Sequence, residues 1–218
     1  MNRMNIGQVK EMLTFVADEI INNEPLLTEI DNKIGDGDHG IGMSLGFRAV
    51  KEKLPCMQVD SINELFKEVG MTMLDAMGGA SGVIFGTMFI SGYGAVPPLG
   101  ELTLEKLGLM MKQSLDNIKK RGRAKLGDKT MIDSYEPAVY GLLESAKRGE
   151  GLVEGLWNAK VEAEKGAERT KSYQAQKGRA EAYGQESLGI PDPGAVSVSI
   201  LFGAMYEYVK RHQEGGGA

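Results

Sequence analysis

The chain has 218 residues, of which 42% are hydrophobic and 25% are charged. That length and balance are typical of one globular domain with a sizeable core. The formal net charge of −5 argues against non-specific nucleic-acid binding, because such proteins use an excess of Lys and Arg to displace the counterions of phosphate groups. The single cysteine, Cys56, excludes an internal disulfide and favours a reducing, cytoplasmic setting.

Two stretches of the sequence could be a signal peptide or a membrane span. The first eleven residues carry Asn, Arg, Gln, Lys and Glu, which argues against a signal peptide. The uncharged run 76–99 is long enough to cross a bilayer, but its many glycines and the pair Pro97-Pro98 favour a helix buried among other helices. We therefore expect no membrane span, one domain over residues 1–213, and a flexible glycine-rich tail over 214–218.

Apolar residues recur at the three- and four-residue spacing of helices along most of the chain. Taken in chain order and bounded by prolines and glycines, this pattern predicts eight helices near residues 6–23, 40–54, 61–77, 80–97, 102–121, 132–147, 151–170 and 193–212. Short connections between long helices favour antiparallel neighbours, so we expect an all-α, up-and-down bundle or closed barrel. Alternate loops then lie at one end, where the loop 31–39 can meet those near 78–81, 122–131 and 171–194.

The loop before the second expected helix concentrates metal-binding chemistry. Asp31, Asp36, Asp38 and His39 lie within nine residues that are interrupted by glycines. Carboxylates this close repel one another, so a hard cation is their natural partner. Mg²⁺ is usually held by one or two carboxylates together with waters and phosphate oxygens. The loop therefore predicts a magnesium site that bridges to phosphate.

Three better-known motifs are tested against the sequence, two at this loop and one at residues 122–130. The stretch 35–40 matches the dinucleotide-binding pattern G-x-G-x-x-G, but no apolar strand precedes it. An EF-hand that starts at Asp36 requires Glu at position 47, where the chain has Phe47. The stretch 122–130 resembles a P-loop with one extra aspartate before its lysine, and no strand precedes it either. None of the three fits.

The other loops at the expected site end each allow two interpretations. The stretch 78–82 either offers backbone N–H groups to an anion or is merely small for close packing. The side chains of Lys177 and Arg179 suit phosphate oxygens, although a solvated basic surface is the simpler explanation. The turn 191–194, which contains two prolines, could be no more than a helix breaker.

Five motifs taken together, in this order along the chain, are nevertheless specific: Ile34–Gly40, Gly78–Gly82, Gly127–Met131, Lys177–Ala180 and Asp192–Gly194. Over about residues 7–211 the chain closely resembles the nucleotide-binding L subunit of dihydroxyacetone kinases. The resemblance implies eight antiparallel helices in a closed barrel, with ADP or ATP and two Mg²⁺ ions at one end. It also implies a kinase subunit that is active only with a K-type subunit, which binds the ketose, and in one branch with an M-type phosphoryl donor of the phosphotransferase system. A homodimer is compatible with it.

Carried over by position, the resemblance assigns the metal ions to Asp31, Asp36 and Asp38. It assigns the nucleotide to His39, Gly40, Ile41, Gly42, Ala80, Ser81, Gly122, Met131, Arg179, Asp192, Pro193 and Gly194. It implies no further catalytic residue in this chain. The sequence departs from the family at Gly42, where many relatives have Asn, so one side-chain hydrogen bond near the phosphates is missing.

Two other functions remain open from the sequence. Carboxylate clusters also build the sites of two-metal phosphoester hydrolases. The chain could instead sense nucleotide and report it to a regulatory partner protein. The ketose is also undetermined: dihydroxyacetone is the family default, and a tetrulose such as erythrulose is the alternative.

Overall fold

A computed structural model describes residues 2–214, with side chains up to residue 213. This part of the chain holds nine α-helices: α1 (Ile6–Asn22), α2 (Glu24–Ile34), α3 (His39–Lys53), α4 (Ile62–Ala76), α5 (Gly79–Ile90), α6 (Leu104–Gly122), α7 (Ile132–Lys147), α8 (Leu152–Arg169) and α9 (Pro193–Glu214). Short 3-10 helices cover Leu54–Cys56, Ser91–Gly94, Thr170–Ser172 and Arg179–Ser187, and the last of these is η4. Strands β1 (Arg3–Asn5) and β2 (Glu101–Thr103) form one antiparallel pair. The all-α class expected from the sequence is confirmed.

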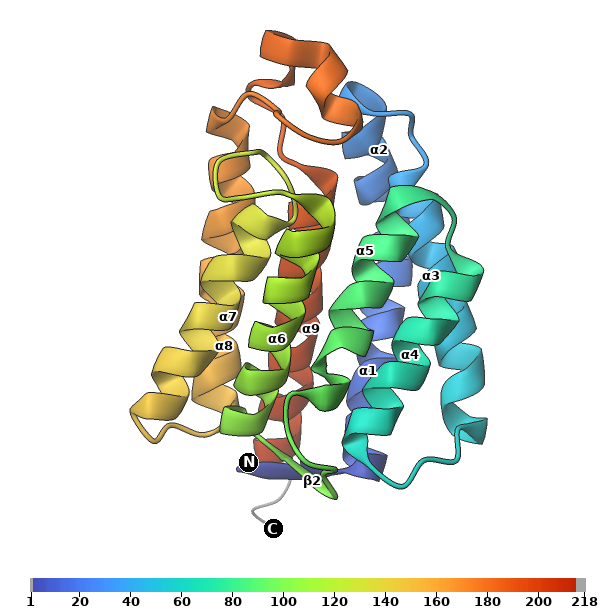
Figure 1. Cartoon of the computed structure of the whole chain (residues 1–218), viewed down its shortest axis with the longest axis vertical. Coiled ribbons are helices and arrows are strands. Elements are labelled where there is room, and N and C mark those ends of the chain that lie inside the picture. Colours follow the sequence, from blue (N-terminus) through green and yellow to red (C-terminus); the bar gives the residue numbers. More distant parts are fainter. Residues whose placement is uncertain (1, 215–218) are drawn as a thin grey trace.

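The long helices alternate in direction and form a bundle in which α2 is a short piece at one end (Figure 1). Each long helix packs against the next, in the order α1, α3, α4, α5, α6, α7, α8 and α9, and α9 packs against α1. The connections α2–α3, α4–α5, α6–α7 and α8–α9 therefore gather at the α2 end, whereas β1 and β2 lie at the opposite end. This arrangement fulfils the expectation that alternate loops meet.

Local sequence explains where the helices begin and how closely they approach. Asn5 caps α1 in a reciprocal capping box with Gln8, and Ser61 caps α4. Glycine lets α8 lie against α7, because a methyl group added at Gly166 would be 2.1 Å from the carbonyl oxygen of Asp133. The many glycines of this chain thus contribute to helix packing as well as to loops.

The structure corrects four details of the expected elements. Helix α2 was missed because Pro25 was interpreted as a break, whereas it occupies the first turn of α2, where no helical N–H is needed. Helix α5 ends at Ile90 rather than near residue 97. The pairing of β1 with β2 was not expected. Helix α9 reaches Glu214, the first residue of the expected tail, and the rest of that tail lies outside the described residues.

The apolar run 76–99 is divided between the 12-residue helix α5, a 3-10 helix and an irregular segment. Among the helices of residues 2–214, none combines the length and the hydropathy that a membrane span requires.

Candidate metal and nucleotide site

The three aspartates of the predicted metal site converge at the α2 end of the bundle. Asp31 lies in the last turn of α2, and Asp36 and Asp38 lie in the turn that leads into α3. One carboxylate oxygen from each lies within 4.8 Å of the others. The turn depends on glycine, because a methyl group at Gly35 would be 2.1 Å from an Asp31 oxygen and Gly37 has a φ of +77°. Three hard oxygen donors at this spacing fit Mg²⁺.

The charges of this cluster are only partly compensated. The Oδ2 atom of Asp31, which is buried, accepts a hydrogen bond of 3.1 Å from the backbone N–H of His39. Asp36 forms an ion pair with Arg179 at 3.0 Å between Oδ2 and Nε. Burial raises the pKa of Asp38, and the nearby Asp36 and Asp31 raise it further, against the opposing effect of Arg179. A cation would relieve this repulsion.

His39 is a neutral group with a defined tautomer. Ser197 in α9 donates its hydroxyl proton to the carbonyl of Pro193 at 3.0 Å, so the contact of 2.8 Å between Ser197 Oγ and His39 Nε2 requires a proton on Nε2. The Nδ1 atom is then an acceptor, and Ser81 Oγ lies 3.2 Å from it. Burial lowers the pKa of His39 to about 4, outweighing the opposite effect of Asp31. His39 therefore orients the Ser81 hydroxyl.

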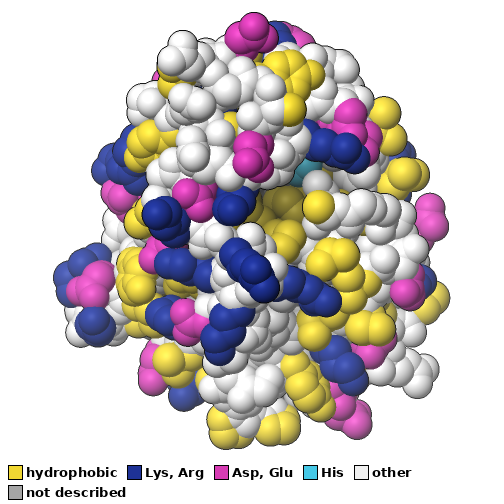
Figure 2. Space-filling view, turned by 45° about the horizontal axis from the view of Figure 1, so that its top comes forward, with side chains coloured by type: hydrophobic (Ala, Val, Ile, Leu, Met, Phe, Trp, Pro, Cys, Tyr) yellow, Lys and Arg dark blue, Asp and Glu magenta, His cyan; other side chains and the backbone are white. Residues whose placement is uncertain are grey.

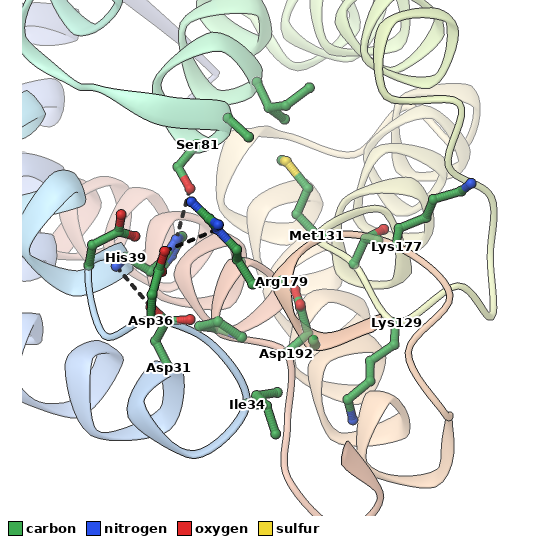
Figure 3. Close-up of a pocket in the computed structure, with 18 of the residues that line it drawn as sticks. Asp31, Ile34, Asp36, His39, Ser81, Lys129, Met131, Lys177, Arg179 and Asp192 are labelled. Carbon is green, nitrogen blue, oxygen red and sulfur yellow. Dashed lines mark hydrogen bonds and ion pairs between the residues drawn. The ribbon is translucent and has the colours of Figure 1, made fainter. Parts of the chain in front are cut away.

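A cavity with about 790 Å³ of empty space opens beside the aspartates. Figure 3 shows Asp31, Asp36, His39, Ser81 and Arg179 on one side of it and Lys129 and Asp192 on the other. Eleven of the fifteen predicted site residues line it: Asp31, Asp36, Asp38, His39, Ala80, Ser81, Met131, Arg179, Asp192, Pro193 and Gly194. All four loops predicted to meet contribute to its wall. In the space-filling view, hydrophobic side chains wall the hollow at this end and Lys and Arg side chains surround it (Figure 2).

The other four predicted residues lie outside this cavity. Gly122 lines an adjoining apolar cavity of about 850 Å³, whose wall includes Met131 as well. Gly40 is packed against α2, since a methyl group there would be 2.5 Å from the carbonyl oxygen of Glu24. Ile41 is 48% exposed, and Gly42 has open space around its Cα. The structure therefore explains Gly40 by packing and leaves the predicted contacts of Ile41 and Gly42 untested.

The two interpretations of the stretch 78–82 apply to different residues. Gly82 is needed for packing, because a methyl group there would be 2.6 Å from the carbonyl oxygen of Met77. No atom lies within 4 Å of such a methyl group at Gly78 or Gly79. Gly78 is the N-cap of α5 and has no side chain to bond the first-turn N–H groups. Ala80 and Ser81 thus begin a helix whose positive end is available to an anion.

Residues 171–190, which we call the cap segment, include η4 and cover the α2 end of the bundle (Figure 1). Its residues 177–180 line the cavity. The Tyr183 hydroxyl donates to the carbonyl of Gly35 at 2.9 Å. Ala175 and Ala180 form a small apolar cluster with Ile34 and with the partly buried Ile190. The cap segment is therefore joined to the aspartate loop at several points.

Sequence reasoning missed Ser197, Tyr183 and Lys129. Ser197 lies one helical turn after Pro193, and Tyr183 is one of several polar residues in a loop. Neither carries a local signal, since each acts on a residue more than a hundred positions away. Lys129 lies inside the motif 127–131, and its charge within that motif is a local signal that could have identified it as a candidate site residue.

Comparisons with known proteins agree with this geometry. Residues 33–207 match the DAK2 domain, a range that includes Asp36 and Asp38 and begins just after Asp31. The chain is 41% identical over 194 residues to "PEP-dependent dihydroxyacetone kinase, ADP-binding subunit DhaL" of Escherichia coli (strain K12), covering 89% of this chain and 92% of that one. It is 38% identical over 191 residues to the ADP-binding subunit DhaL of PEP-dependent dihydroxyacetone kinase 1 of Listeria innocua, covering 88% and 90%.

A solved structure shares the fold. The dihydroxyacetone kinase of C. freundii in complex with AMP-PNP and Mg²⁺ matches with a TM-score of 0.74 and 28% identity, over 95% of this chain and 34% of that one. This chain therefore corresponds to about a third of that larger protein. The sequence match extends over most of the chain and the fold agrees with it. The chain belongs to the DAK2 domain family.

Proposed function

We propose that this chain is the nucleotide-binding subunit of a dihydroxyacetone kinase, which holds ADP or ATP with Mg²⁺ for phosphoryl transfer to a ketose on a separate K-type subunit. The observation that carries the proposal is the convergence of Asp31, Asp36 and Asp38 beside a cavity lined by the other family motifs. Relatives named as ADP-binding subunits of PEP-dependent kinases cover nearly the whole chain, which supports ADP as the resident nucleotide and an M-type protein as phosphoryl donor.

The three aspartates would hold the metal, since they supply the oxygen ligands that Mg²⁺ prefers. Bound Mg²⁺ would neutralise phosphate oxygens and orient the transferring group. The pair between Asp36 and Arg179 competes with this arrangement, but its side chains are 40% and 75% exposed, so it contributes little stability. Arg179 can therefore exchange Asp36 for a phosphate oxygen when a cation takes its place.

The remaining contacts would place the phosphates of the nucleotide in the cavity beside the aspartates and its base in the adjoining apolar cavity. Ser81, oriented by the neutral His39, presents a hydroxyl beside the aspartates, and α5 directs the N–H groups of its first turn there. The adjoining apolar cavity at Met131 and Gly122 suits the flat, poorly hydrated base. Nothing in this division requires a further catalytic side chain, because phosphoryl transfer depends mainly on positioning and electrostatics.

Calorimetry with ADP tests the proposal. Wild-type protein should bind ADP in Mg²⁺ and lose that binding in EDTA, while Asp36→Ala should bind weakly in either buffer. Adding a K-type subunit, a phosphorylated M-type donor and dihydroxyacetone should then yield the ketose phosphate. Absence of Mg²⁺-dependent ADP binding would exclude the proposal. Steady release of phosphate from small phosphoesters by the chain alone would favour a two-metal hydrolase instead.

A further inference from the structure

Lys129 is a buried charged side chain to which the proposed function assigns no role. It lies in the loop between α6 and α7, lines the cavity and has a relative accessibility of 0%. Burying an ammonium group is costly unless its protons are satisfied. Its hydrogen-bond partners are backbone carbonyls rather than carboxylates. Because burying the ammonium group of Lys129 costs free energy, we expect it to have a specific structural role.

The two acceptors lie together at the base of the cap segment: Thr170 directly precedes it, and Ile190 is its last residue. Nζ of Lys129 donates to the carbonyl of Thr170 at 2.6 Å and to the carbonyl of Ile190 at 2.5 Å. Hydrogen bonds that a charged group donates are about twice as strong as those between neutral groups. Two weaker contacts close the same base: the N–H of Gly189 with the carbonyl of Lys171, and the N–H of Asp192 with Thr170 Oγ1, both at 2.8 Å. One ammonium group thus joins both ends of this loop.

Besides Lys129, the cap segment is held by a few polar contacts, which include those of Tyr183 with the carbonyl of Gly35 and of the Gln176 N–H with the carbonyl of Asp128 at 3.0 Å. Its buried apolar contacts are limited to Ala175 and Ala180 against Ile34, so hydrophobic burial contributes little to holding it. It carries Arg179, whose guanidinium reaches the aspartate loop. The location of Arg179 therefore depends on how firmly the base of the cap segment is held.

The backbone around Lys129 is built to point its side chain inward. Lys129 itself has a φ of +60°, which is unfavourable for a residue with a Cβ atom. The carboxylate of Asp133 holds this turn by accepting hydrogen bonds from the N–H groups of Gly127 at 2.6 Å and Thr130 at 2.8 Å. The strain is tolerated because the turn delivers the ammonium group to the two carbonyls.

We propose that Lys129 is a positioning residue that ties both ends of the cap segment and thereby holds Arg179 at the phosphate end of the nucleotide site. This inference rests on the proposed function, because it assigns a consequence for nucleotide binding. It predicts that removing the ammonium group loosens residues 171–190 and shortens the lifetime of bound nucleotide, while the helices of the bundle keep their stability.

The experiment compares Lys129→Met with Lys129→Arg and with the control Lys171→Met. Methionine removes the charge and the donors at similar length, arginine restores both, and Lys171 is a neighbouring lysine that only pairs with Glu168 at the surface. Hydrogen exchange is measured without nucleotide, and dissociation of Mg²⁺-ADP is measured by stopped flow. For Lys129→Met we expect exchange in the cap segment and dissociation each to rise by at least about tenfold, because two charged hydrogen bonds are lost. Lys129→Arg should recover part of both, and Lys171→Met should match wild type.

Three outcomes would overturn the inference. The first is unchanged exchange in the cap segment of Lys129→Met. The second is exchange that accelerates equally in α1 and α4, which would make Lys129 a general stabiliser. The third is faster cap exchange with unchanged Mg²⁺-ADP dissociation. If wild type binds no Mg²⁺-ADP, the proposed function fails, whereas the exchange data still test the tether. If Lys129→Met does not fold, Lys129→Gln, which can donate to one carbonyl only, is judged by the same criteria.

Discussion

Replacing Asp38 with asparagine should change stability in opposite directions without and with ligand. Asp38 faces two other carboxylates at separations within 4.8 Å. Because Asp36 and Asp38 are exposed, each repulsion is worth about 1 kcal/mol in water-like surroundings, and Arg179 offsets part of it. Asp38→Asn should therefore raise the free energy of unfolding of the ligand-free protein by about 1 kcal/mol, which shifts Tm by about 2–4 °C.

With Mg²⁺-ADP bound, wild type should be more stable than Asp38→Asn. At an ADP concentration about 100 times its Kd in Mg²⁺, wild type should gain about 2.7 kcal/mol, or roughly 5–10 °C in Tm. Loss of one carboxylate ligand should weaken binding at least about tenfold, which reduces that gain to about 1.4 kcal/mol or less. Thermal unfolding with EDTA and with Mg²⁺-ADP measures both effects.

The pH dependence and a control make the test specific. The pKa of Asp38 is raised in the folded state, so its cost to stability is absent at low pH and appears as pH rises through that pKa. The advantage of Asp38→Asn should thus be present at pH 8 and fade toward pH 4. Asp60→Asn, just before the N-cap of α4 at the opposite end, should leave the Tm gain from Mg²⁺-ADP unchanged. A less stable ligand-free Asp38→Asn that keeps the full Mg²⁺-ADP gain would refute the reasoning.

Three further predictions follow from individual contacts. Gly166→Ala should lower the free energy of unfolding, measured in urea, by about 2–3 kcal/mol, because the new methyl group would lie 2.1 Å from a carbonyl oxygen of α7. The control Gly203→Ala places its methyl group in open space and should raise the free energy of unfolding by up to about 1 kcal/mol. Arg179→Lys should weaken Mg²⁺-ADP binding about tenfold in calorimetry, because the planar fork that now reaches Asp36 is lost, and equal affinity would show that the guanidinium makes no such contact. Burial raises the pKa of Asp192 to about 7, so its stabilising contribution is complete below pH 4 and lost as pH rises through 7. The urea midpoint of ligand-free wild type should therefore fall between pH 5 and pH 8 by more than that of Asp192→Asn.

Sequence reasoning succeeded where the signal is local and repeated. The periodicity of α1 and α7 sets both their type and their length, because a helix that buries one face needs apolar residues every three or four positions. Alternation of long helices then placed four distant loops at one end, and eleven of the predicted residues do line one cavity there. The aspartate cluster was visible because its three carboxylates lie within eight residues.

The errors arose where one residue type allows two structures. Pro25 ends a helix when it falls in the interior, but it starts one in the first turn, and only the packing of α2 over α3 decides between them. Strands β1 and β2 have three residues each and pair across about a hundred positions, so neither shows a periodicity of its own. In both cases tertiary contact, which the sequence does not display, determines the local state.

The contacts that position the site are harder to predict than the site itself. Mg²⁺ is usually held by one or two carboxylates, so chemistry narrows the choice of candidate residues in advance. The acceptors of Lys129 are backbone carbonyls, and every residue has one, so sequence cannot name Thr170 or Ile190. The same holds for the carbonyl of Gly35 that accepts from Tyr183. Side chains that act on backbone groups are therefore the part of this site that only a structure reveals, and the cap segment is held chiefly by such contacts.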